Sequence, residues 1–241
     1  MMTSTATANV SYETATRTAD MTGMQRMARK MWAPWAVMGL MIVGIALILG
    51  VVLQAKVGFI FEFDKVTRDG DTGAILEARQ FVETTKAWLP AFKFLGLGML
   101  LGSITFLLAT ILGNLRAGGA AVQRSLGADV KAFKPAIANV FPMLMMMGVM
   151  VLIAAFVVGI VNATTTNDLY SHSIAAIDSS AAGSELLRQL GTVNAVATWL
   201  APFKFVGMAL LFSGIAVALL TIVRVLRWQT GRLVEIAGGG K

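Results

Sequence analysis

The sequence contains no cysteine and only one histidine, His172. The absence of cysteine excludes disulfides, thiolate metal sites and catalytic thiols. A single imidazole cannot supply the two or three histidine ligands of the common haem and zinc sites. Motifs for phosphate-binding glycine loops and zinc proteases are also absent from the sequence. We therefore expect no enzymatic activity, no cofactor and no metal site.

Charged residues are scarce as well. They make up 14% of the chain, against about 25% in soluble domains, whereas 56% of the residues are hydrophobic and the mean hydropathy is +0.73. A membrane-spanning helix needs roughly 20 apolar residues, and four charge-free stretches are long enough or nearly so: 31–55, 94–115, 135–167 and 205–223. The sequence predicts an all-α integral membrane protein with four transmembrane helices. Because these stretches hold no Asp or Glu, they lack the usual proton-relay groups of pumps.

Two parts of the chain resemble each other. Residues 88–116 and 199–227, offset by 111 positions, are identical at 13 of 29 positions. Residues 38–50 repeat more faintly at an offset of 109, where Gly39 coincides with Gly148 and Gly50 with Gly159. We interpret this as two tandem, parallel copies of a helical hairpin related by a pseudo-twofold axis.

The basic residues are unevenly distributed. Residues 1–30, 116–134 and 224–241 together carry 12 Lys and Arg against four acids, whereas the remaining loops, 56–86 and 162–198, are acidic on balance. By the positive-inside rule both termini are cytoplasmic. We expect the protein in a membrane, most simply a prokaryotic cytoplasmic membrane.

The segments outside the spans carry weaker patterns. Residues 1–19 are polar and aperiodic and predict a disordered tail, followed by an interfacial helix from Asp20. Alternation at 59–63 suggests a short strand, and helices are expected from about Thr72 and Ser184. The two outer loops would form a small cap. Adjacent glycines in 117–120 suggest a flexible turn.

These patterns together give a domain plan. The predicted segments, in order, are a tail at 1–19; repeat 1 at 20–116, with spans at about 33–54 and 88–115 around the outer loop 56–86; a linker at 117–134; repeat 2 at 135–227, with spans at about 138–161 and 199–223 around the outer loop 162–198; and a tail at 228–241.

Lys93 and Lys204 occupy equivalent positions in the repeated motif Trp-Leu-x-x-Phe-Lys-Phe, which begins at Trp88 and Trp199. A lysine beside a tryptophan near a helix end commonly anchors the helix in the membrane interface. Two lysines at equal depth could instead bind a lipid phosphate or a carboxylate of a partner. We treat these four residues as the candidate lipid- or partner-binding set.

Small residues four positions apart form a second candidate set. Gly98 and Gly102 in one copy correspond to Ala209 and Ser213 in the other. Such spacing lets another helix approach closely and gain dispersion contacts. We therefore predict helix packing at these positions, within the chain or against another subunit.

Helix 135–167 carries a methionine-rich face that includes Met146, Met147 and Met150. Thioethers can bind copper(I), but with no cysteine and one histidine the ligand set is incomplete, and we favour apolar packing.

We expect a non-catalytic accessory or scaffold subunit that packs against itself, as a homo-oligomer, or against other membrane subunits. Its partners would be membrane proteins and lipids, and no nucleic acid. One alternative is a passive channel or carrier for an anion or small solute along the pseudo-twofold axis. Another is a subunit of a membrane enzyme whose cofactor is held by other chains.

Overall fold

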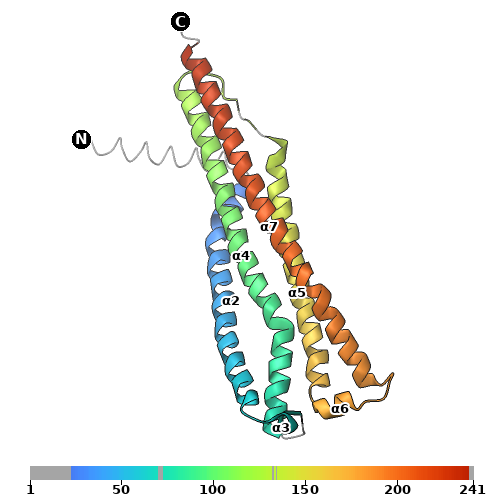
Figure 1. The fold of residues 1–241 in the computed structure, drawn as a ribbon. Coiled ribbons are helices and arrows are strands. Elements are labelled where there is room, and N and C mark those ends of the chain that lie inside the picture. Colours follow the sequence, from blue (N-terminus) through green and yellow to red (C-terminus); the bar gives the residue numbers. More distant parts are fainter. Residues whose placement is uncertain (1–22, 70–72, 132, 134, 239–241) are drawn as a thin grey trace, which may run out of the picture. The chain divides into compact units, whose positions relative to one another are not determined.

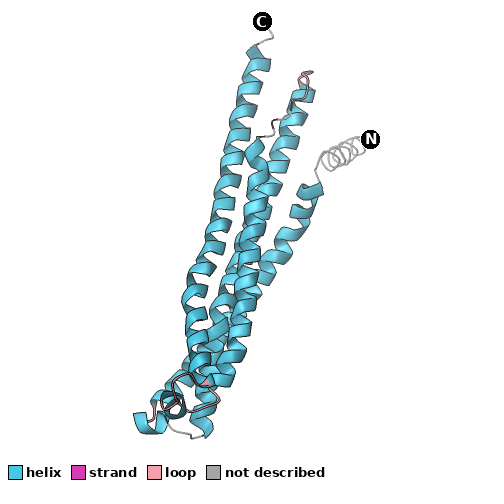
Figure 2. Ribbon diagram, turned by 90° about the vertical axis from the view of Figure 1, so that its right-hand side faces the viewer, coloured by secondary structure: helices cyan, strands magenta, loops and turns pink. Residues whose placement is uncertain are grey.

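The computed structural model describes residues 23–69, 73–131, 133 and 135–238 and is all-helical over them (Figures 1 and 2). The expected tail at 1–19 and the start of the interfacial helix lie outside the described residues. The helices are, in chain order, α2 (Gly23–Phe61), α3 (Lys65–Asp69), α4 (Gly73–Ser125), the 3₁₀ helix η1 (Ala136–Asn139), α5 (Val140–Leu169), α6 (Ile174–Asp178) and α7 (Glu185–Gly238).

Four of these helices are long and apolar enough to cross a membrane, which supports an integral membrane protein. They are α2, α4, the segment from η1 through α5, and α7. Helices α4 and α7 have 53 and 54 residues, more than twice the roughly 20 that a span requires. Both helices therefore extend well beyond the apolar segments that the hydropathy pattern marks as spans.

Side-chain caps begin the short helices α3 and α6 and the long helix α7. Asp64 accepts a hydrogen bond from the Thr67 amide (2.8 Å) at the start of α3, and Ser173 caps α6. The Ser184 hydroxyl accepts a hydrogen bond from the Leu187 amide at the start of α7. These caps satisfy amide groups that the first turn of a helix leaves without partners.

Two expectations about local structure are wrong. The alternating segment 59–63 is not a strand, because α2 continues to Phe61 and Ile60 packs with Ala78 and Val82 of α4. Residues 117–120 are not a flexible turn but part of α4, where Gly119 lies directly against the Gln229 side chain. In both places the helix continues and makes a tertiary contact that the local pattern does not reveal, and such contacts commonly override local preference.

The described residues divide into two compact units, and each long helix contributes a segment to both. One unit contains 37–100 and 146–211. The other contains the rest of the described chain. The second unit has a core formed by Ala28, Leu108, Ala109, Leu112, Phe141, Ala218 and Val225.

Two glycine crossings hold the helices of the unit 37–100 and 146–211. A Cβ on Gly39 of α2 would lie 2.9 Å from the Gly96 carbonyl oxygen of α4, and a Cβ on Gly148 of α5 would lie 2.9 Å from the Gly207 carbonyl oxygen of α7. These approaches are too close for any side chain. Helix α2 thus pairs with α4, and α5 with α7 (Figure 1). The four glycines coincide in the two aligned halves of the sequence.

Candidate functional site

The two motif lysines both lie in the unit 37–100 and 146–211, on α4 and α7. The tryptophan of each motif makes the same contact. The Trp88 ring packs edge-on against Phe92 at 5.6 Å, and the Trp199 ring packs edge-on against Phe203 at 5.7 Å. Phe94 also meets Phe205 edge to face at 5.3 Å, so the motif phenylalanines link α4 to α7 directly.

The two lysines themselves have different environments. Lys204 is only 8% exposed, and its ammonium nitrogen lies 5.6 Å from the centroid of the Phe94 ring. This is cation–π geometry, in which the ring face attracts the cation. Lys93 is exposed, and its ammonium nitrogen lies 3.7 Å from the position that a Cβ on Gly50 of α2 would occupy. Equivalent positions in the sequence therefore give one enclosed cation and one accessible cation.

The two motif tryptophans also differ in exposure. Trp199 is 45% exposed, whereas Trp88 is half-buried. Gly159 of α5 packs against the Trp88 backbone, with 3.4 Å between a Cβ on Gly159 and the Trp88 Cα. Phe92 of the same motif packs on Phe156 of α5. The first motif is thus covered by α5, while the second has an open side.

The four small residues also have different environments on α4 and α7. A Cβ on Gly98 would overlap Leu152 of α5 and approach Leu211 of α7, and a Cβ on Gly102 would lie 3.1 Å from the Trp35 ring. Both glycines therefore make room for side chains of this chain. Ala209 and Ser213 are exposed; Ala209 belongs to the unit 37–100 and 146–211, and Ser213 belongs to the other unit.

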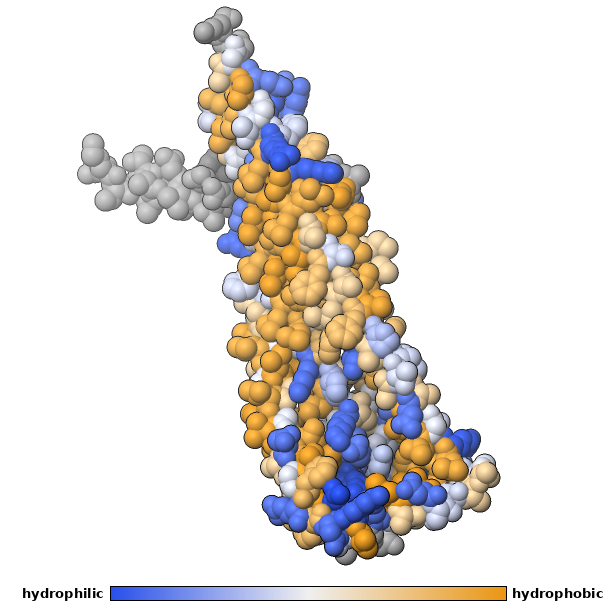
Figure 3. Space-filling model, in the orientation of Figure 1, coloured by the Kyte–Doolittle hydropathy of each residue, from blue (hydrophilic) through white to orange (hydrophobic). Residues whose placement is uncertain are grey.

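Hydrophilic side chains gather where α3 and α6 join the long helices, as Figure 3 shows for one face. The sole histidine lies here, and its ring nitrogen Nδ1 is 3.3 Å from both the Ser171 hydroxyl and the Asp168 carbonyl oxygen. Within the described part of the chain, no three His, Asp or Glu side chains are grouped to hold a metal. Met146, Met147 and Met150 are exposed apolar residues.

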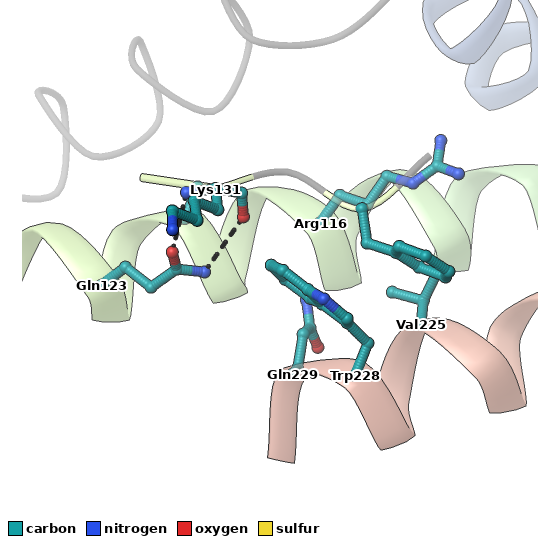
Figure 4. Close-up of a pocket in the computed structure, with 8 residues that line it drawn as sticks. Arg116, Gln123, Lys131, Val225, Trp228 and Gln229 are labelled. Carbon is teal, nitrogen blue, oxygen red and sulfur yellow. Dashed lines mark hydrogen bonds between the residues drawn. The ribbon is translucent and has the colours of Figure 1, made fainter. Parts of the chain in front are cut away.

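The unit that contains residues 101–145 and 212–238 has a pocket that no sequence pattern predicted (Figure 4). The Gln123 side chain donates to the Lys131 carbonyl (3.3 Å) and accepts from its amide (2.9 Å), and Phe133 stacks on Trp228 at 5.7 Å. The Arg116 guanidinium points away from Trp228. These contacts hold the segment after α4 against α4 and α7. Of the polar side chains in the pocket, Gln123 holds this segment and Gln229 donates to the Leu115 carbonyl oxygen of α4 (2.8 Å), whereas the Arg116 Nε and Nη2 atoms are buried without a hydrogen-bond partner among the described residues.

No protein-family model, curated protein or solved structure matches this chain. The function of the candidate site is therefore inferred from its geometry.

Proposed function

We propose that this protein is a non-catalytic accessory or scaffold subunit of the membrane, packing against itself or against a larger membrane complex. It consists of two duplicated hairpins, α2–α4 and α5–α7, whose equivalent glycine crossings support the duplication. The loops around α3 and α6 form an extramembrane cap, and both termini face the cytoplasm of a prokaryotic cell. The basic residues of 116–134 and 224–241 support this orientation.

The open surface around Ala209 carries the proposal. Its equivalent, Gly98, is filled by Leu152 and Leu211, but Ala209 is exposed and lies beside the exposed side chains of Phe205 and Val206. In lipid, a small residue on a helix surface lets a second helix approach closely enough to gain dispersion contacts. The α7 surface therefore has the shape of a helix-packing site that the described part of the chain does not fill.

Native mass spectrometry of the protein extracted in mild detergent tests this function. Wild-type protein is expected as an oligomer or with a co-extracted membrane subunit. Ala209→Trp should disrupt that assembly, because an indole prevents the close approach. Ala154→Trp, at an exposed alanine of α5, is the matched control and should leave it intact. A wild-type monomer without partner subunits, or assembly that survives Ala209→Trp, would contradict the proposal.

A second candidate, a passive anion conduit, is favoured by one observation: the enclosed Lys204. A buried cation can raise the local anion concentration in a narrow path. Anion flux through wild-type protein in liposomes separates the two functions. The scaffold predicts flux at the empty-vesicle level. A leak that disappears in Lys204→Gln but persists in Lys93→Gln would establish the conduit instead.

A further inference from the structure

The exposed Lys93 lies beside an apolar stretch of α2. Its ammonium nitrogen faces Gly50, and no described residue provides it with a hydrogen bond or an acidic partner. On either side of Gly50, α2 presents exposed apolar side chains: Leu47, Ile48, Val51 and Val52. A hydrocarbon layer that covers these side chains also surrounds the ammonium.

The depth of this cation follows from the helix register. The next basic residue of α2 toward α3 is Lys56, six residues beyond Gly50, which corresponds to about 9 Å along a helix. Lys93 also precedes Gly96 by one turn of α4, and Gly96 packs against Ile42 and Val43 near the middle of the charge-free stretch 31–55. The ammonium is therefore located inside the charge-free stretch 31–55, beside a residue five positions before its end. An ionised group that is surrounded by hydrocarbon is costly, and it characteristically pairs with another group or extends to the membrane interface.

The equivalent lysine, Lys204, has surroundings within this chain that stabilise its charge. Lys204 is enclosed, and its ammonium lies over the Phe94 ring. Lys93 has neither enclosure nor an aromatic face among the described residues. The described residues therefore provide no counter-charge for Lys93, and a group from another molecule can supply one.

We propose that Lys93 and Gly50 form a docking site for a carboxylate on a transmembrane helix of a different protein. This inference rests on the proposed accessory function and names the chemistry of the partner. A second copy cannot supply the group, because the four charge-free stretches contain no Asp or Glu. A lipid phosphate fits less well, because it would have to descend below the level of Lys56. Gly50 has no side chain to block the approach of a helix.

A synthetic transmembrane peptide tests the site. The peptide is a Leu-Ala helix with one central Asp, its control carries Asn instead, and binding to the full-length protein is followed by energy transfer in phosphatidylcholine vesicles. Wild type should bind the Asp peptide at least about threefold more tightly, the ratio that corresponds to an average interhelical hydrogen bond. Lys93→Gln and Gly50→Leu should both abolish this preference. Lys204→Gln is the matched control and should retain it.

Equal binding of the two peptides to wild type, or a preference that survives Lys93→Gln, would overturn the proposal. The proposal would also be overturned if added phosphatidylglycerol removed the preference and bound the protein in a Lys93-dependent way. The lipid phosphate would then be the ligand. Native mass spectrometry separates this result from the function itself. A co-extracted subunit that remains bound in Lys93→Gln refutes the site and keeps the accessory function. A wild-type protein that is monomeric, carries no partner subunit and still prefers the Asp peptide refutes the accessory function and keeps the site.

Discussion

A single methyl group should disrupt the crossing of α5 and α7. A Cβ on Gly207 would lie 2.8 Å from Leu152 Cδ2, 2.9 Å from Leu152 Cγ and 3.2 Å from the Gly148 carbonyl oxygen. Leu152 is 1% exposed, so its branch point has no free space to move into. Gly207→Ala must therefore separate the helices or displace Leu152. Gly44→Ala on α2 is the matched control, because nothing lies within 4 Å of the added Cβ.

Two opposing effects set the magnitude. Alanine favours the helix over glycine by up to about 1 kcal/mol, whereas overpacking a filled interface costs about 1–3 kcal/mol. Gly44→Ala receives only the first effect and should be neutral or stabilising. Gly207→Ala receives both. Its free energy of unfolding should lie about 1–3 kcal/mol below that of Gly44→Ala.

Unfolding by sodium dodecyl sulfate in mixed micelles, followed by helical circular dichroism, measures both variants. Leu152→Ala has a cavity cost of its own, but it removes the atoms that the new methyl group meets, so the double variant should be more stable than the sum of the single changes predicts. If Gly207→Ala were as stable as Gly44→Ala, the crossing would not depend on the missing side chain, and this account of the hairpin would be refuted.

Two further predictions concern the ends of the helices. The hydrogen bonds from Thr67 lower the pKa of Asp64, so the ordering of α3 should be complete above the usual carboxyl pKa, about 4, and lost as the pH falls through the lowered value; Asp64→Ala should remove this dependence, measured by amide exchange at Thr67. In intact cells a cysteine at Ser179 should react with an impermeant maleimide and one at Ser125 should not, and the reverse pattern would invert the proposed orientation.

The four membrane-length helices could be predicted because hydropathy is a property of each segment alone. The environments of the lysines could not. The contrast between Lys93 and Lys204 depends on which helix covers each motif, and the register of α4 against α2 depends on the crossing of Gly39 with Gly96. Such contacts leave no trace in the hydropathy of a single helix. The turn expected around Gly119 failed for the same reason, since its glycine accommodates Gln229, which is 110 residues away in the sequence.

The glycine crossings also bear on how the chain is made. Gly39 and Gly96 are 57 residues apart, and Gly148 and Gly207 are 59 apart, whereas Phe94 and Phe205 are separated by 111. Contacts close in sequence form with less loss of chain entropy than distant ones. During synthesis, which proceeds from the N-terminus, α2 and α4 can close on each other before α7 has been translated. The aromatic contact between α4 and α7 then joins two hairpins that are already formed.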